Sequence, residues 1–211
     1  MYTDRASAGG VLATRLGAYA GRDDVIVLAL PRGGVVVAAE VASALGAPLD
    51  VCVVRKLGVP GREELAFGAV AAGGALVLNH EVVQAFRLSE EDIQSVVGRE
   101  RVELERRERA YRGASAAPLS VTSKTVLLVD DGLATGATMR AAVEAVRTAG
   151  PARIVVAVPV AASATCAMLE RMADEVISAE IPTSFFAVGQ WYVDFRQTTD
   201  DEVRELLAVT R

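Results

Sequence analysis

Two adjacent carboxylates, Asp130 and Asp131, are the residues of this sequence best placed to do chemistry. They follow an apolar run at residues 126–129 and precede a loop of small and hydroxyl residues at 134–138. Such a loop lets backbone N–H groups approach a ligand closely, and the helix that it opens favours an anion at its N-terminus. A carboxylate and an anion about 4 Å apart repel by roughly 4 kcal/mol at an effective dielectric near 20, so the acids need hydroxyl donors or a divalent cation between them and that anion. A sugar phosphate with a metal ion meets these conditions.

The alternative is that the two acids only form a strand-to-helix turn, because Asp and Gly are common in turns and Asp caps helices. The Ala, Thr and Gly residues that follow favour phosphate binding instead. Other phosphate signatures are absent from the sequence: no Gly-Lys-Ser/Thr follows a strand, and no G-x-G-x-x-G opens a helix. A P-loop NTPase and a dinucleotide-binding Rossmann site are therefore not expected.

The stretch 126–138 resembles the phosphoribosyl-pyrophosphate (PRPP) signature of type I phosphoribosyltransferases, in which an apolar strand and two acids precede a Thr-Gly-x-Thr loop. The resemblance implies that Asp130 and Asp131 hold the ribose 2′- and 3′-hydroxyls and bind Mg²⁺, directly or through water. It also implies that a five-residue loop wraps the 5-phosphate: Ala134, Thr135, Gly136, Ala137 and Thr138.

A second match follows the apolar run at residues 25–30, where Pro31, Arg32, Gly33 and Gly34 precede a helical pattern. Proline fixes one turn dihedral, and paired glycines allow backbone conformations closed to other residues. The corresponding loop of the family binds pyrophosphate, with Arg32 as the cation here. The alternative is a plain turn with a surface arginine.

A third match begins at Arg55 and Lys56, in a segment at 55–64 that is basic and rich in Gly and Pro. This composition predicts a mobile surface loop. It resembles the Arg-Lys pair before the flexible lid of adenine and orotate phosphoribosyltransferases, which implies that both cations bind pyrophosphate. Glu64 is a candidate proton acceptor. A solvated hairpin with charged flanks is the alternative.

The segment 181–196 is rich in aromatic residues and resembles the base-binding hood of hypoxanthine-type phosphoribosyltransferases. Phe185 or Phe186 is then the residue that stacks on the base, with Trp191 beside it and Asp194 as the polar partner. Core packing of the aromatics is the alternative. Hypoxanthine-type enzymes carry an acid where this chain has Ala134, and their base-reading lysine is missing at 160–163, so the sequence leaves the base open.

Strand and helix patterns alternate along the chain. We expect helices at 6–19, 35–45, 139–149 and 163–172, and strands at 25–30, 49–54, 66–71, 75–78, 124–130, 153–160 and 175–178. Alternation implies right-handed crossovers and a parallel sheet, with ligands at the carboxyl ends of the strands. Gly73 and Gly74 suggest a hairpin between two of the strands. The expected fold is α/β: a type I phosphoribosyltransferase-like three-layer fold with a central, mainly parallel sheet, a flexible lid hairpin and a small hood. One domain spans 1–211, with its core at 25–178 and the hood at 179–211.

A long helix is predicted at residues 89–112, with Ser89 as its N-cap and Asp92 answering it. Opposite charges stand four residues apart, as in Arg99 with Glu103 and Glu103 with Arg107. A solvated helix is the simplest interpretation. Its arginines could instead line the site or a subunit contact, and the sequence does not decide between these roles.

Composition narrows the class of protein. The chain has 211 residues, 52% of them hydrophobic, and a net charge of −5, which argues against general nucleic-acid binding. No apolar stretch reaches the roughly 18 residues of a membrane span, and no signal peptide is evident, so we expect a cytoplasmic location. Cys52 and Cys166 are expected to be buried structural thiols. We also expect a homo-oligomer, most simply a dimer.

These observations predict a Mg²⁺-dependent phosphoribosyltransferase that joins a nucleobase-like acceptor to the ribose 5-phosphate of PRPP and releases pyrophosphate. Arg32 and Lys56 would stabilise the departing diphosphate, and Asp130 and Asp131 the developing positive charge on the ribose. One alternative is a regulator or sensor of the same fold that binds PRPP without catalysis. Another is a hydrolase or phosphorylase acting on a different sugar phosphate.

Overall fold

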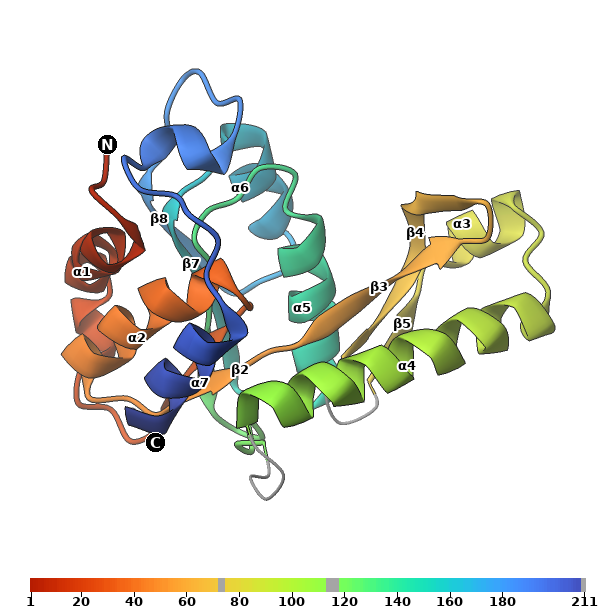
Figure 1. Ribbon diagram of the computed structural model, residues 1–211, viewed down its shortest axis with the longest axis horizontal. Coiled ribbons are helices and arrows are strands. Elements are labelled where there is room, and N and C mark those ends of the chain that lie inside the picture. The colour runs from red at the N-terminus through yellow and green to blue at the C-terminus, as the bar shows by residue number, and fades with distance from the viewer. Residues whose placement is uncertain (72–74, 113–117, 210–211) are drawn as a thin grey trace.

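A five-stranded parallel sheet forms the centre of the molecule (Figure 1). The structure is a computed structural model that describes residues 1–71, 75–112 and 118–209. The strands lie in the order β2-β1-β6-β7-β8 and are all parallel. Their bounds are β1 (Val25–Ala29), β2 (Leu49–Val51), β6 (Thr125–Val129), β7 (Arg153–Val160) and β8 (Glu175–Glu180). The predicted parallel α/β architecture is confirmed.

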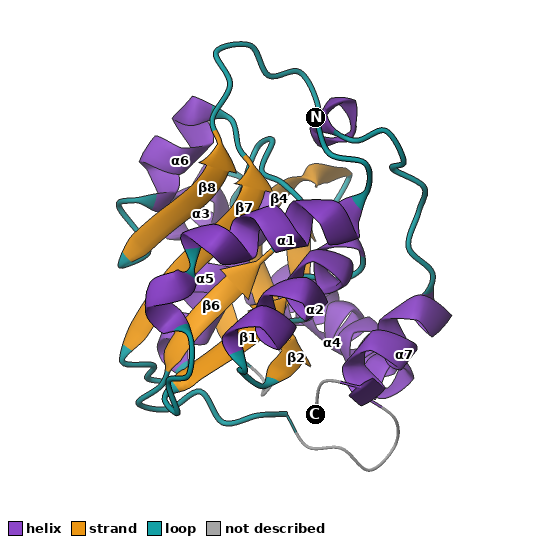
Figure 2. Ribbon diagram, turned by 90° about the vertical axis from the view of Figure 1, so that its left-hand side faces the viewer, coloured by secondary structure: helices purple, strands orange, loops and turns teal. Residues whose placement is uncertain are grey.

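Helices cover both faces of this sheet, which gives three layers (Figure 2). One face packs against α1 (Arg5–Arg15) and α2 (Gly33–Leu45), and the other against α5 (Ala137–Thr148) and α6 (Ser163–Leu169). Strand β1 shows why its sequence is a continuous apolar run: Val27 faces the α1–α2 side, and Ile26 and Leu28 face the α5–α6 side. A strand buried on both faces has no position for a polar residue.

A second, antiparallel sheet extends away from the core beside a long helix (Figure 1). It consists of β3 (Val54–Val59), β4 (Arg62–Ala71) and β5 (Leu76–Leu78), followed by α3 (His80–Ala85) and α4 (Glu90–Arg112). The single strand predicted at 49–54 is wrong, because β2 and β3 belong to different sheets. The loop predicted at 55–64 is also wrong, since most of it is paired strand with Leu57 and Val59 buried. The turn predicted at Gly73 and Gly74 lies outside the described residues.

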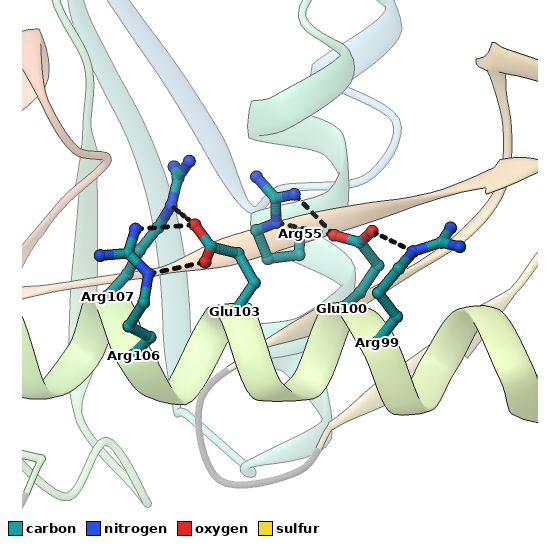
Figure 3. Close-up of polar contacts among 6 residues, drawn as sticks. All are labelled: Arg55, Arg99, Glu100, Glu103, Arg106 and Arg107. Atoms are coloured by element: carbon teal, nitrogen blue, oxygen red, sulfur yellow. Dashed lines mark hydrogen bonds and ion pairs between the residues drawn. The ribbon is translucent and has the colours of Figure 1, made fainter.

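Helix α4 begins as predicted. The Oγ of Ser89 accepts a hydrogen bond from the Asp92 N–H at 3.1 Å, and the Asp92 carboxylate accepts one from the Ser89 N–H at 3.0 Å. The Glu103–Arg107 ion pair is confirmed, but Arg99 pairs with Glu100 and not with Glu103 (Figure 3). Arg106 donates to both carboxylate oxygens of Glu103, and the two arginines lower the Glu103 pKa to about 2.

The remaining elements are two 3₁₀ turns, η1 (Gly17–Tyr19) and η3 (Val188–Trp191), and a C-terminal helix α7 (Asp200–Val209). Helix α7 packs against α2 and α4, with Val203 and Leu207 buried. Cys52 and Cys166 are buried free thiols, as predicted, and burial raises the pKa of Cys52 to about 12. In the part of the chain that the structure describes, no helix is both long and apolar enough to cross a membrane.

Candidate active site

The acid pair lies where β6 ends, directly against the start of α2. The carboxylate of Asp130 accepts a hydrogen bond from the Asp131 N–H at 2.8 Å. A Cβ added to Gly34 would stand 2.9 Å from the Cα of Asp130 and 2.9 Å from the Val129 carbonyl oxygen. Only glycine allows this approach, so the glycines of the second motif serve to bring it against the first. The structure therefore brings together two loops that are about 100 residues apart in the chain, as the parallel topology predicts.

Arg5, at the start of α1, contacts the acid pair. Its Nε lies 2.7 Å from Oδ2 of Asp131, and the side chains of Arg5 and Asp131 are only 11% and 15% exposed. The phenol of Tyr192 donates to the Asp131 carbonyl oxygen at 2.5 Å. Sequence reasoning missed both Arg5 and Tyr192. Tyr192 belongs to the aromatic segment 181–196, so its place near the site could have been suspected. The sequence around Arg5 contains no signal for its contact with an acid 126 residues away.

Burial controls the charge of the pair. It raises the pKa of Asp130 well above the ordinary value, and the neighbouring Asp131 charge raises it further. Burial also raises the pKa of Asp131, while the Arg5 guanidinium acts in the opposite direction. Hydroxyl donors or a cation would relieve the repulsion between the two carboxylates.

The predicted phosphate loop joins the acid pair to α5. Gly136 has φ 69°, the left-handed region that favours glycine, and a Cβ there would stand 2.5 Å from Cγ2 of Thr165. The hydroxyl of Thr165 donates to the Ala134 carbonyl oxygen at 2.5 Å, which fixes the loop against α6. Thr135 and Thr138 are exposed. The loop thus presents its hydroxyls and the N-terminus of a twelve-residue helix to solvent.

The predicted pyrophosphate loop contacts the C-terminal helix. The peptide bond between Pro31 and Arg32 is cis. The Arg32 Nη1 lies 3.7 Å from Oδ1 of Asp200, the first residue of α7, and the Arg32 side chain is 35% exposed. The buried Tyr111 of α4 donates its phenol to the same Asp200 oxygen at 3.2 Å. Arg32 therefore lies at the expected end of the sheet, already engaged by a carboxylate.

Arg55 and Lys56 lie on opposite faces of β3, as adjacent strand residues must. The guanidinium of Arg55 bonds to Glu100 of α4, with nitrogen–oxygen distances of 2.6 and 2.9 Å (Figure 3). Lys56 borders a cavity of about 150 Å³ together with Ala137 and Arg140 of α5. Lys56 thus lies near the phosphate loop, whereas Arg55 does not share its cavity. The side chain of Glu64 lies outside the described part of the structure.

The predicted base-binding residues do not gather at one place. Asp194 borders a cavity of about 180 Å³ with Arg5, Arg196 and Glu202, close to the acid pair. The side chain of Phe186 is 87% exposed, and Phe185 is half-buried.

Trp191 packs against a small cluster of Tyr2, Ala8 and Tyr192. Its indole Nε1 is buried without a hydrogen-bond partner among the described residues. Phe195, which sequence reasoning did not select, stacks on Tyr192 with ring centroids 5.1 Å apart. The aromatics of this segment are therefore divided between packing and solvent.

The described residues contain no group of three or more His, Cys, Asp or Glu side chains able to hold a metal ion. The acid pair offers two carboxylates. Mg²⁺ is commonly bound by one or two carboxylates together with substrate phosphates and water. The donor set therefore fits a cation that is shared with a diphosphate ligand.

Comparison with known families identifies the domain. A family model described as "Phosphoribosyl transferase domain" matches residues 6–196. The chain belongs to the phosphoribosyl transferase family. The resemblance found in the acid-pair motif is thus confirmed at the level of the family, and the match covers both predicted phosphate loops, the hairpin and the whole aromatic segment.

Two curated relatives from Mycobacterium tuberculosis are 48% identical to this phosphoribosyl transferase domain over 204 residues. Their names are "Putative phosphoribosyl transferase MT0597", from strain CDC 1551 / Oshkosh, and "Putative phosphoribosyl transferase Rv0571c", from strain ATCC 25618 / H37Rv. The match covers 96% of this chain and 45% of each relative, so the chain spans less than half of their length.

Solved structures similar to this chain have the same fold. The protein TT1426 from Thermus thermophilus is similar with a TM-score of 0.87 and 43% identity, covering 99% of this chain and 98% of that one. The AQ2163 protein from Aquifex aeolicus has a TM-score of 0.51 at 12% identity, covering 98% of this chain and 86% of that one, and supports the fold alone.

Proposed function

We propose that this domain transfers the ribose 5-phosphate of PRPP to a nucleobase-like acceptor and releases pyrophosphate. The observation that carries the proposal is the meeting of Asp130 and Asp131 with the glycines of the Arg32 loop at the carboxyl edge of the sheet. The loop after β6 offers the N-terminus of α5 to a monophosphate, and the loop after the neighbouring strand β1 offers Arg32 to a diphosphate. A bound PRPP would span the two loops, with its ribose over the acids.

The acids act on the ribose. Asp130 and Asp131 accept hydrogen bonds from its 2′- and 3′-hydroxyls and stabilise the positive charge that develops on the ring as the bond to pyrophosphate breaks. Because the pair is largely buried, its field is strong where that charge appears. Positioning and electrostatic stabilisation supply the catalysis, so no covalent intermediate is required.

Arg32 and Lys56 act on the leaving group. To bind the diphosphate, Arg32 has to break its ion pair with Asp200. An exposed ion pair contributes only about 0–1 kcal/mol, so this exchange costs little. Lys56 is exposed on β3 and is free to turn toward the diphosphate if the hairpin moves. Glu64 remains the candidate for accepting a proton from the acceptor.

Asp130 and Asp131 are the residues that would hold Mg²⁺, which would neutralise charge on the diphosphate when bound. The acceptor would enter from the side of Asp194 and Arg5, which line the 180 Å³ cavity; Arg5 also contacts Asp131. Phe185, Phe186 and Trp191 remain candidates for stacking on the acceptor. The exposed Phe186 would have to turn inward to do so.

The test measures pyrophosphate release from PRPP and Mg²⁺ with a panel of nucleobases. We expect release with at least one base, and we expect Asp130→Asn and Asp131→Asn to reduce turnover by a factor of about 100 or more, on the order of what transition-state charge stabilisation contributes. Asp23→Asn, at an exposed site before β1, is the control and should leave turnover unchanged. Undiminished turnover in both acid variants would refute the assignment.

A PRPP-binding regulator without catalysis is the second candidate. The observation that favours it is that Arg5, Arg32 and Arg55 are all engaged by carboxylates of the protein itself. Titration calorimetry with PRPP separates the two functions. Tight binding with no turnover for any base would favour the regulator, and pyrophosphate release with a base would favour the transferase.

A further inference from the structure

Arg5, in the first turn of α1, contacts two parts of the molecule that are distant in sequence. Its Nε bonds to Oδ2 of Asp131 at 2.7 Å, and its Nη1 donates to the Arg196 carbonyl oxygen at 2.8 Å. Its guanidinium carbon lies 4.0 Å from the centroid of the Phe195 ring. One planar group thus joins the acid pair to the segment that borders the acceptor-side cavity.

These contacts leave the guanidinium little freedom. A planar fork that donates in two directions and stacks on an aromatic face is held in one orientation, which a flexible ammonium group would not be. The start of α2 also packs directly against the guanidinium, because a Cβ on Gly33 would stand 2.7 Å from the Arg5 Nε. The Arg5 side chain is also largely buried, so water competes weakly for its hydrogen bonds.

The contact also decides which carboxylate oxygen of Asp131 faces a ligand. Arg5 takes Oδ2, and no hydrogen bond to Oδ1 is found among the described residues. With Oδ2 held, Oδ1 is the oxygen left to accept a ribose hydroxyl. An Asp131 side chain released from Arg5 would be free to rotate, and its productive orientation would be only one of several.

We propose that Arg5 is a positioning residue of the phosphoribosyl site: it orients Asp131 toward the ribose and ties that orientation to the segment carrying Phe195 and Arg196. This inference rests on the proposed function, because it assigns the ribose to Asp131. It predicts that Arg5 affects ribose binding through Asp131 alone and not through the fold.

The test compares Arg5→Gln, Arg5→Lys and the control Arg15→Gln, which changes an exposed arginine at the other end of the same helix. Binding of PRPP and of ribose 5-phosphate is measured by calorimetry, with thermal unfolding as the check on folding. We expect Arg5→Gln to weaken the binding of both ligands roughly 10- to 100-fold, by analogy with the loss seen when the hydrogen-bond partner of a metal-ligating side chain is removed.

Arg5→Lys should restore part of the loss, because it keeps the charge but not the fork or the stacking. Arg15→Gln should bind like the wild type. In turnover with an accepted base, Arg5→Gln should raise KM for PRPP more than it lowers kcat.

A double-mutant cycle decides whether the effect passes through Asp131. In an Asp131→Asn background, the further change Arg5→Gln should weaken ribose 5-phosphate by less than about twofold, since coupled residues are not additive. An equal loss in both backgrounds would overturn the inference, as would unchanged binding in the single variant. If the wild-type protein binds neither PRPP nor ribose 5-phosphate, both the inference and the proposed function fail. If the wild type binds and Arg5→Gln binds equally well, only the inference fails.

Discussion

Replacing Gly34 by alanine would place a methyl group where the backbone of the acid pair already lies. The added Cβ would stand 2.9 Å from the Asp130 Cα and 2.9 Å from the Val129 carbonyl oxygen, distances that real Cβ contacts essentially never show. Neither of these atoms can rotate away, so α2 or the end of β6 must shift. Overpacking of this kind costs roughly 1–3 kcal/mol. At roughly 2–4 °C per kcal/mol for a chain of this size, Gly34→Ala should unfold about 2–12 °C below the wild type.

Gly33→Ala provides the contrast. Its Cβ would meet Oδ2 of Asp131 and, at 2.7 Å, Nε of Arg5, which are the ends of flexible side chains. We expect a smaller change in unfolding temperature than for Gly34→Ala but a loss of PRPP binding, because the carboxylate has to move. Gly98→Ala, in the exposed middle of α4 with no atom within 4 Å, is the control and should stabilise by about 0.5–1 kcal/mol.

Differential scanning fluorimetry on the three variants, with calorimetric titration of PRPP, measures both effects. The reasoning is refuted if Gly34→Ala unfolds at the wild-type temperature. It is equally refuted if Gly98→Ala is destabilised as much as Gly34→Ala, because the loss would then reflect alanine itself and not the close approach.

Two further predictions concern charge. Arg112 pairs with the buried Asp50 at 2.8 Å, so Arg112→Met removes the cation beside a buried carboxylate and should lower the free energy of unfolding in urea by roughly 3–5 kcal/mol. Arg109→Met, at an exposed site of the same helix, should change it by less than about 0.5 kcal/mol. The raised pKa of Asp130 means that the folded state holds its proton to higher pH than the unfolded chain, so its burial lowers stability as pH rises above about 4. Asp130→Asn should therefore unfold at a higher temperature than wild type at pH ~7.5, with the difference closing near pH ~4, and a constant difference across that range would contradict the raised pKa.

The core of the fold was predictable because its signals are local. An apolar run such as residues 126–129, ended by acids and glycine, identifies a buried strand and the loop at its carboxyl end without knowledge of the partner strands. The capping of α4 by Ser89 and Asp92 was likewise predictable, because the two residues belong to one four-residue pattern. The location of the two predicted phosphate loops followed as well, because parallel topology places every such loop at one edge of the sheet.

Residues 55–64 were predicted to be a loop because their charged residues obscure the alternation of buried and exposed positions that is typical of a strand. Leu57 and Val59 are buried on one face of β3, with the Arg55 carbon chain on the same side and Lys56 on the other. Period-two alternation before Gly61 was present in the sequence, but what makes the strand stable is the cover supplied by α4, about forty residues further on. Contacts such as Arg5 with Asp131 have no local signature at all, so only the folded chain shows them.

Helix α4 links the hairpin to the Arg32 loop through polar contacts at two positions along its length. Near the middle of α4, Glu100 forms an ion pair with Arg55. Near its end, the phenol of Tyr111 donates to Asp200, which in turn forms an ion pair with Arg32. Helix α4 thus contacts β3 directly and contacts the Arg32 loop through Asp200 of α7; Arg32 and the hairpin are the groups predicted to bind the leaving group. A ligand that binds Arg32 in place of Asp200 removes the contact between the Arg32 loop and this end of α4. A hairpin that moves toward the site must either move α4 with it or break the ion pair between Arg55 and Glu100. We therefore expect ligand binding at the Arg32 loop to change the mobility of the hairpin.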